Sequence, residues 1–297
     1  MIFTSPYILA LATLAMRVLA LDLPNYRAIR TSLIGGVLNV TFHNPDWPQV
    51  NFWGQSTQDE MTDLVERLHV DNETKVVVFS SDVPRFFIAH LDTSIFASPG
   101  GDEFIFTFAN LLYNITTLPQ VTIGAIEGRA RGAGAEFLSS LDMRFATTVD
   151  TLIGAPEVSA GLIPGGGGGV LLASLVGRAQ AMEYVLSARD VTASEAERLG
   201  WINRAFETSA ELHAHINLLT SRIRLFPLIS IQAAKEMINR VARPSFEDFY
   251  AEAMTFTKVT QDPLVQQVQA TSNRILGSMD LLEVELTLPD WVHLFFE

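Results

Sequence analysis

Apolar runs alternate with amphipathic segments through the first two thirds of the chain. The continuous apolar runs at 75–81 and 120–128 predict buried parallel strands, because a strand that is covered on both faces has no polar side. The segment 33–45 alternates apolar and polar residues around a Gly-Gly pair, which predicts a strand leaving a turn. The segment 56–70 has apolar residues at helical spacing behind a Ser or Thr cap. Strands that alternate with helices predict an α/β domain.

After about residue 206 the strand patterns stop, and only amphipathic helical patterns follow. Such helices are predicted at 211–226, 230–241 and 246–261. A helical tail of this length packs on the core or builds an oligomer interface. We therefore expect a core at 21–206 and a C-terminal helical region at 207–297.

The first 20 residues have the pattern of a signal peptide. The apolar run 7–16 is shorter than the roughly 20 residues that span a bilayer. Val18 and Ala20 supply the small residues that a cleavage site needs, so we predict a signal peptide at 1–20. No Lys or Arg precedes the apolar run, which leaves an ordinary N-terminal helix as the alternative.

Glycosylation and location follow from this leader. Asn-X-Ser/Thr sequons stand at Asn39, Asn72 and Asn114, and they predict a glycoprotein if the chain enters the secretory pathway. We expect secretion or residence in that pathway if the leader is cleaved, and a cytoplasmic location otherwise. The chain ends in LFFE, which is not a peroxisomal signal.

Composition narrows the function classes. The 297 residues are 48% hydrophobic and 18% charged, which predicts a folded chain with a large core. The net charge of −13 argues against nucleic acid and against anionic membrane surfaces, because both attract basic proteins. The absence of cysteine excludes disulfides, thiol catalysis and thiolate metal sites.

Several common motifs fail in this chain. The five glycines at 165–169 lack a following Gly-Lys-Ser/Thr, and Val170 occupies the third glycine position of a dinucleotide fingerprint. They predict instead a flexible turn that opens a helix. The segment 157–161 lacks the first glycine of a serine-hydrolase elbow. His213 and His215 fall on opposite sides of a helix, so no metal site is expected.

Two carboxylates in apolar, glycine-rich surroundings are candidates for acid-base chemistry. Glu136 follows RGAGA, and Glu157 follows IGAP. Burial in such a setting raises the pKa of a carboxyl group toward the range useful for proton transfer. The alternative for Glu136 is a first-turn acid that the helix dipole favours, and for Glu157 a solvated loop residue. The residues alone leave both alternatives open.

Five ordered segments between about Tyr26 and Phe206 resemble the enoyl-CoA hydratase/isomerase (crotonase) family. They read NPDWPQVNFWGQSTQDEM, RFFIAHLD, LPQVTIGAIEGRARGAGAEF, IGAPEVSAGLIPGGGGG and VGRAQAMEYVLSARDVTASEAERLGWINRAF. The resemblance implies an α/β crotonase spiral of repeated β-β-α units. It also implies a C-terminal helical oligomerisation region.

The resemblance assigns roles to individual residues. The backbone N–H groups of Ala89 and Ala133 would form an oxyanion hole for a thioester oxygen, and Glu136 and Glu157 would be the catalytic acid-base pair. The expected substrate-binding residues are Arg85, His90, Leu91, Asp92, Gly132 and Gly134.

The chain departs from the family pattern within these motifs. Ala133 stands where the family has glycine, and its Cβ costs about 1 kcal/mol if the backbone needs a positive φ. His90 and Leu91 replace Gly-Ala and should crowd the entrance beside Ala89. Arginines replace apolar residues at 129 and 131, Phe52 and Trp53 could narrow the pocket, and Gly169–Leu171 replace Thr-Gln-Arg.

The resemblance implies hydration of an α,β-unsaturated acyl thioester, with coenzyme A as part of the substrate and no separate cofactor. An isomerase or dehydratase of specialised metabolism is one alternative. A secreted, non-catalytic binding protein with the same fold is another. The expected partners are the acyl thioester and further copies of the chain, as a homotrimer or a dimer of trimers. No nucleic acid and no membrane span are expected.

Overall fold

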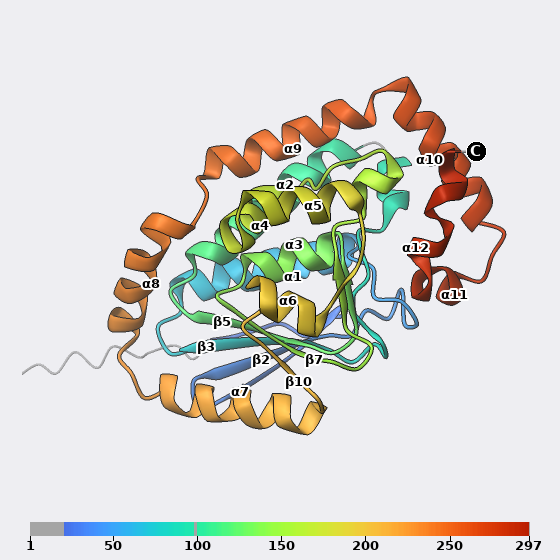
Figure 1. The fold of residues 1–297 in the computed structure, drawn as a ribbon. Coiled ribbons are helices and arrows are strands. Elements are labelled where there is room, and N and C mark those ends of the chain that lie inside the picture. The colour runs from blue at the N-terminus through green and yellow to red at the C-terminus, as the bar shows by residue number, and fades with distance from the viewer. Residues whose placement is uncertain (1–20, 98–99, 297) are drawn as a thin grey trace, which may run out of the picture.

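The computed structural model describes residues 21–97 and 100–296, so the predicted signal peptide lies outside the described residues. Its strands form two sheets, and the larger one underlies most of the helices in Figure 1. The larger sheet contains, in spatial order, β1 (Ile29–Ile34), β2 (Val37–Phe42), β3 (Val76–Ser81), β5 (Val121–Ile126), β7 (Met143–Thr147) and β10 (Arg204–Phe206). The smaller sheet contains β4 (Phe86–Ile88), β6 (Arg129–Arg131), β8 (Leu152–Gly154) and β9 (Val191–Thr192).

One unit recurs along the chain: a strand of the larger sheet, a strand of the smaller sheet, and a helix. The unit appears as β3-β4-α2, β5-β6-α3 and β7-β8-α4. Strands β2, β3, β5, β7 and β10 run parallel to one another, as do β4, β6 and β8, whereas β1 and β9 are antiparallel to the strands they pair with. This arrangement confirms the predicted α/β spiral of β-β-α units. The helices of this region are α1 (Gln55–Val70), α2 (Gly101–Thr117), α3 (Ala133–Ser140), α4 (Gly168–Val176), α5 (Arg178–Ser187) and α6 (Ala193–Leu199), with the short 3₁₀ turns η1 (Thr93–Ala97) and η2 (Glu157–Ala160).

The hydrophobic patterns located the long strands and helices correctly, but they missed one strand and misplaced one helix cap. The two continuous apolar runs are the buried strands β3 and β5. Strand β1 was not predicted; it pairs antiparallel with β2 across the Gly35–Gly36 turn, where both glycines have positive φ. The predicted Ser or Thr cap of α1 is wrong, because the helix begins at Gln55 and Gly54 precedes it without a side-chain bond.

Beyond β10 the described chain is helical, as predicted. The elements are α7 (Ser209–Ile223), α8 (Leu228–Ala242), α9 (Phe246–Thr260), α10 (Pro263–Leu276), α11 (Leu281–Leu286), α12 (Leu288–Trp291) and η3 (Val292–Phe296). Helix α9 packs on α2 and α4, whereas α8 stands at the edge of the molecule (Figure 1). The helices after α9 were not predicted individually. The division of the chain at residue 206 stays a prediction.

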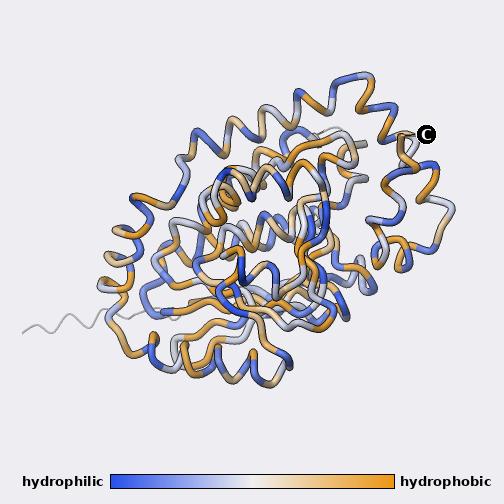
Figure 2. The backbone as a smooth tube through the Cα atoms, viewed as in Figure 1, coloured by the Kyte–Doolittle hydropathy of each residue, from blue (hydrophilic) through white to orange (hydrophobic). Residues whose placement is uncertain are grey.

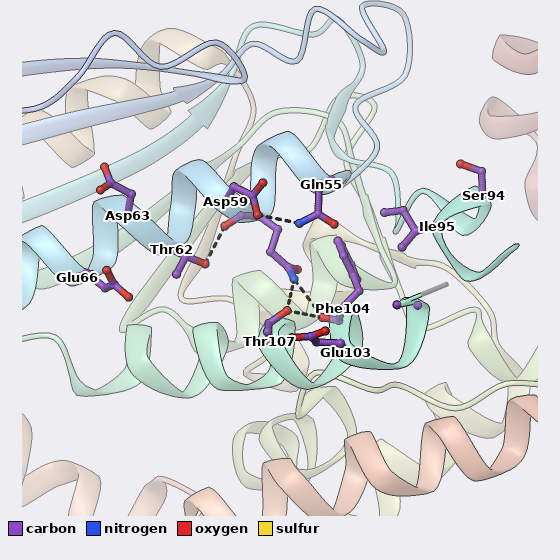
Figure 3. Close-up of a pocket in the computed structure, with 13 residues that line it drawn as sticks. Gln55, Asp59, Thr62, Asp63, Glu66, Ser94, Ile95, Glu103, Phe104 and Thr107 are labelled. Atoms are coloured by element: carbon purple, nitrogen blue, oxygen red, sulfur yellow. Dashed lines mark hydrogen bonds between the residues drawn. The ribbon is translucent and has the colours of Figure 1, made fainter. Parts of the chain in front are cut away.

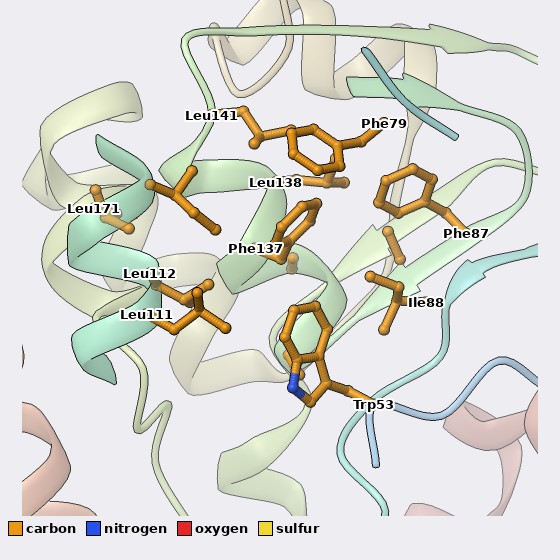
Figure 4. Close-up of a cluster of buried hydrophobic side chains, with 14 of the residues drawn as sticks. Trp53, Phe79, Phe87, Ile88, Leu111, Leu112, Phe137, Leu138, Leu141 and Leu171 are labelled. Atoms are coloured by element: carbon orange, nitrogen blue, oxygen red, sulfur yellow. The ribbon is translucent and has the colours of Figure 1, made fainter. Parts of the chain in front are cut away.

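The core lies between the sheets and the first helices, with Phe137 of α3 near its centre (Figure 4). The Phe137 ring centroid lies 5.1 Å from that of Phe79 and 5.4 Å from those of Phe42 and Trp53. Aromatic contacts on several sides of Phe137 prevent α3 from rotating about its axis. Because Glu136 precedes Phe137, this packing also determines where the Glu136 carboxyl group lies.

The surface features predicted from the sequence are placed as follows. Asn39 and Asn72 are exposed, and Asn114 is half-buried on α2. Glycosylation of these sequons stays a prediction. Within the described part of the chain, no helix has the length and apolarity needed to cross a bilayer.

Candidate active site

Glu136 is buried in the first turn of α3, with 4% of the residue exposed. Its Oε1 accepts hydrogen bonds from the N–H groups of Gly166 at 2.7 Å and Gly168 at 3.1 Å. Burial raises the pKa of Glu136 to about 7, and these backbone N–H groups oppose the rise by favouring the carboxylate. The carboxyl group therefore exchanges its proton near neutral pH.

Glu157 is the first residue of η2, which follows strand β8 of the smaller sheet in the chain. Its Oε2 is buried and has no hydrogen-bond partner among the described residues. Its Oε1 faces Gly132, where a Cβ atom would lie only 3.0 Å away. Burial raises the pKa of Glu157 well above the usual value, and the charge of Glu136 raises it further. The two predicted acids are thus close enough for the charge of Glu136 to act on Glu157. Because its Oε2 is buried, Glu157 is not a solvated loop residue.

The backbone that leads into α3 explains two of the predicted glycines. Gly132 adopts φ 49°, so it takes the positive φ and Ala133 does not. The strain considered for Ala133 is therefore absent. A Cβ atom on Gly134 would overlap the carbonyl oxygen of Ile88, so Gly134 allows α3 to pack against β4. A binding role for either glycine stays a prediction.

The two predicted oxyanion donors differ in this structure. Ala133 is the first residue of α3, and its N–H makes no hydrogen bond to any described residue. The N–H of Ala89, by contrast, donates to the carbonyl oxygen of Asn51 at 2.8 Å. A ligand oxygen at Ala89 would have to share or replace that bond. The oxyanion role of both residues stays a prediction.

The crowding expected beside Ala89 comes from His90. Its ring lies on Phe52 with a centroid distance of 4.6 Å, and its Nδ1 contacts the Leu91 carbonyl oxygen at 2.6 Å. Its Nε2 lies 3.0 Å from Oε1 of Glu285 on α11. Both ring nitrogens face acceptors, which is the arrangement of an imidazolium paired with a carboxylate.

The pKa values of this pair move in the matching directions. Although burial alone lowers the pKa of His90, the charge and hydrogen bond of Glu285 raise it overall. Burial alone raises the pKa of Glu285, and the charge and hydrogen bond of His90 reverse this to a lowered value. The pair is therefore a buried ion pair that joins the segment after β4 to the C-terminal tail.

The other residues predicted to bind substrate have partners within the protein. Leu91 is buried and pairs with Trp53 in an isolated β-bridge. Asp92 accepts hydrogen bonds from the N–H and hydroxyl of Ser94 and so shapes η1. The guanidinium of Arg85 lies 3.2 Å from the carboxylate of Asp150, and both side chains are largely exposed. None of these three side chains contacts Glu136 or Glu157 through a hydrogen bond in the described structure.

The arginines that depart from the family pattern are buried in β6. Arg131 binds Asp190 through two hydrogen bonds of 2.8 and 2.6 Å, and donates to the Glu285 carbonyl oxygen at 2.6 Å. Arg129 donates to the Leu286 carbonyl oxygen at 3.3 Å. Cations at the C-terminal carbonyl groups of a helix are favourable, so both arginines hold the end of α11.

Helix α11 consequently covers the segment that contains Ala89. Its residues Leu282 and Leu286 pack on an apolar cluster that includes Trp47, Phe52 and Ala89. The C-terminal tail of the same chain thus forms one wall beside the predicted oxyanion alanine. The sequence did not reveal this contact, because about 190 residues separate the two partners.

A third carboxylate, which the sequence did not single out, lies at the glycine loop. Glu252 of α9 accepts hydrogen bonds from the N–H groups of Gly167, Gly169 and Val170 at 3.1, 3.1 and 3.2 Å. Burial raises its pKa to about 8, and the charge of Glu136 contributes to the rise. Its sequence signal is an acid placed between Phe249 and Phe256 on the buried stripe of an amphipathic helix.

A large cavity lies elsewhere. It has a volume of about 800 Å³ and opens between α1, α2 and η1 (Figure 3). Its wall carries acidic side chains, including Asp59, Asp63, Glu66 and Glu103, and none of the predicted site residues. This groove is therefore separate from the Glu136–Glu157 pair. Over residues 21–97 and 100–296, no cluster of His, Asp or Glu is arranged to hold a metal ion.

The chain is similar to known proteins in sequence. The family model described as enoyl-CoA hydratase/isomerase matches residues 33–271. The short-chain-enoyl-CoA hydratase of Clostridium acetobutylicum is 28% identical over 209 residues, which cover 69% of this chain and 78% of that protein. The human mitochondrial methylglutaconyl-CoA hydratase is 31% identical over 154 residues, or 51% of this chain and 45% of that protein.

A solved structure extends the likeness to the whole fold. The crystal structure titled "putative enoyl-CoA hydratase" from Streptomyces avermitilis superimposes with a TM-score of 0.82 and 31% sequence identity. The match covers 91% of this chain and 99% of that one. The spiral and the helical tail are thus shared with that protein.

The glycine loop should not tolerate a side chain at Gly167. Its φ is 96°, and a Cβ atom would overlap the buried ring of Phe249. We expect Gly167→Ala to lower the free energy of unfolding by about 2–4 kcal/mol, from backbone strain and overpacking together. Gly54→Ala is the control, because a Cβ there meets nothing within 4 Å, and it should cost less than about 1 kcal/mol. Equal effects in urea titrations would contradict this account of the loop.

The His90–Glu285 pair should control how firmly α11 is docked. Its stabilisation is lost as pH falls through the lowered pKa of Glu285, and again as pH rises through the raised pKa of His90. Between these limits, Glu285→Gln should reduce the hydrogen-exchange protection of α11 by about tenfold to a hundredfold, the loss of one charged hydrogen bond.

Glu283→Gln, an exposed change on the same helix, is the control for α11 docking and should leave the protection unchanged. Equal protection in wild type and Glu285→Gln at pH 6 would show that the ion pair does not hold the helix.

Proposed function

The chain belongs to the enoyl-CoA hydratase/isomerase family, and we propose that it is an enzyme that adds water to an α,β-unsaturated acyl thioester of the enoyl-CoA type. The observation that carries this proposal is the difference between its two neighbouring buried carboxyl groups. Glu136 is stabilised as a carboxylate by two backbone N–H groups, whereas Glu157 has a buried oxygen without a partner among the described residues. Neighbouring groups with separated proton affinities can serve as base and acid at the same pH.

The proposed reaction uses each carboxyl group once. The Glu136 carboxylate takes a proton from water while the water oxygen bonds to the β-carbon of the substrate. The electron pair of the carbon–carbon double bond moves toward the thioester oxygen, and Glu157 gives its proton to the α-carbon. One water is thereby added, and a proton passes from Glu136 back to Glu157 before the next cycle.

The developing negative charge on the thioester oxygen needs hydrogen-bond donors. The N–H of Ala133, which bonds to no described residue, supports this role, and each such donor typically contributes about 10²–10³ in rate. The second donor would be Ala89, whose N–H would share or replace its bond to Asn51 when the substrate binds. We propose coenzyme A as the carrier within the substrate, with no separate cofactor.

A double-bond isomerase is the second candidate, and the position of Glu136 favours it. Oε1 of Glu136 is already held by Gly166 and Gly168, which leaves Glu157 with the less constrained carboxyl group. An isomerase removes a proton from one carbon and returns it to another, which one carboxyl group can do. Such an enzyme would depend mainly on Glu157 and would place no water oxygen in the product.

Loss of either acid should abolish hydration. We expect Glu136→Gln and Glu157→Gln each to reduce kcat/KM for an enoyl-CoA by at least about 10²-fold, because an amide neither accepts nor donates the required proton. The wild-type rate should rise with pH through about 7, as Glu136 loses its proton. Spectrophotometric loss of the conjugated thioester measures both effects.

Glu127→Gln is the matched control for the acid pair, because this partly exposed carboxylate pairs with His213 outside the site. Turnover in water labelled with oxygen-18 separates the two candidates: hydration labels the product hydroxyl, and isomerisation does not. If Glu136→Gln and Glu157→Gln were both as active as wild type, neither reaction could be assigned to these residues.

Self-association is the further partner that we propose. Helix α8 exposes several large apolar side chains. It lies at the edge of the molecule, where Figure 2 shows hydrophobic residues along it. Val241 is 91% exposed and Ile229 is 72% exposed, and Met237 and Ile238 lie on the same helix. An apolar helix face of this kind is typical of a subunit interface. We propose a homotrimer or a dimer of trimers.

Charge on this face should dissociate the assembly. We expect Ile238→Glu combined with Val241→Asp to shift the protein to monomers in analytical ultracentrifugation, because the interface would have to bury unpaired carboxylates. Val70→Asp, at an equally exposed apolar position on α1, should leave the assembly unchanged. A wild type that sediments as a monomer would contradict the proposed interface.

A further inference from the structure

Glu252 is an acid on the buried side of a helix whose polar residues otherwise face solvent. Its neighbours on the stripe, Phe249, Ala253 and Phe256, are buried. A carboxyl group in this position is costly unless it is hydrogen-bonded. Among the described residues no cation pairs with it, and all of its bonds go to backbone N–H groups of the glycine loop.

Glu252 and Glu136 bind alternate residues of that loop. Glu136 accepts from Gly166 and Gly168, and Glu252 accepts from Gly167 and Gly169, with Val170 as its third donor. The two carboxyl groups therefore hold one short segment, one from α3 and the other from α9. The N–H groups belong to the loop and to the start of α4, so the helix dipole supports both anions.

Glycine is required because the carboxyl groups approach so closely. A Cβ atom on Gly168 would lie 2.5 Å from Cγ of Glu136, and one on Gly169 would lie 3.0 Å from Oε2 of Glu252. The hydrogen bonds to Glu252 thus keep the loop where its other N–H groups reach Glu136. Displacing Glu252 would release the donors on one side and let the loop move away from Glu136.

The charges of the three acids also influence one another. The charge of Glu136 raises the pKa of both Glu252 and Glu157, and the charge of Glu252 raises the pKa of Glu157 as well. Glu136 on α3 and Glu157 on η2 are the titratable groups that face Glu252. With a pKa of about 8, Glu252 becomes charged just above the pH at which Glu136 does.

We propose that Glu252 is a positioning residue for the acid pair: it holds the glycine loop against Glu136 and places a carboxyl group beside the pair. The assignment of base and acid rests on the proposed hydration reaction. The geometric part, a loop held from both sides, does not depend on that reaction.

The test compares Glu252→Gln with wild type in the pH dependence of kcat/KM for an enoyl-CoA. The amide oxygen can still accept from the loop, but the negative charge is gone. We expect the alkaline loss of activity to move to lower pH by about one unit, the size of a typical effect from a neighbouring like charge. Glu247→Gln, on the exposed side of the same helix, is the control and should not shift the profile.

A second measurement needs no turnover. Titration of carbon-13-labelled glutamate carboxyl groups in the free protein should show the last buried carboxyl to ionise moving to lower pH in Glu252→Gln. If wild type has no activity, the proposed reaction fails, and this titration still decides the role of Glu252. Superimposable titrations of the carboxyl groups that both proteins retain would overturn the inference.

Glu252→Asp covers the case in which Glu252→Gln does not fold. It keeps the charge but shortens the reach by one methylene, so its carboxylate cannot hold the loop as wild type does. We expect the alkaline loss of activity to occur near the same pH as in wild type, because the charge is kept. We expect kcat to fall by about tenfold, because the loop and Glu136 would be misplaced. A kcat equal to that of wild type would overturn the positioning role.

Discussion

The burial of carboxyl groups against the backbone N–H groups of one glycine loop is the constraint on which the site depends. Glu136 and Glu252 each need several donors to be tolerated inside the protein, and the loop supplies them from alternate residues. That demand accounts for the glycines, for the start of α4 at Gly168 and for the approach of α9 to the core.

The aromatic core and this loop act together on α3. Phe137 is surrounded by Phe42, Trp53 and Phe79, so the helix cannot turn about its axis. Glu136 is consequently presented to the loop and not to solvent. Burial raises the pKa of this carboxyl group to about 7, and the N–H groups of the loop oppose a larger rise by favouring the carboxylate.

Three of the residues that depart from the family pattern have partners in the C-terminal tail. Arg129 and Arg131 bind the carbonyl groups at the end of α11, and His90 pairs with Glu285. These substitutions belong to one network that fastens the tail over the segment around Ala89. A pocket built this way is shaped by residues that lie far apart in the chain.

The sequence by itself determined the long strands and helices, the α/β class and the two candidate acids, because local periodicity and ordered motifs report on these features. Short strands such as β6 escaped it, since three residues reading Arg-Ala-Arg show no hydrophobic pattern. Only the tertiary structure decided that Glu252 and Glu285 join the site and that the Ala89 N–H is bonded to Asn51. These contacts arise from packing between distant segments, and the periodicity of one segment carries no information about its partner.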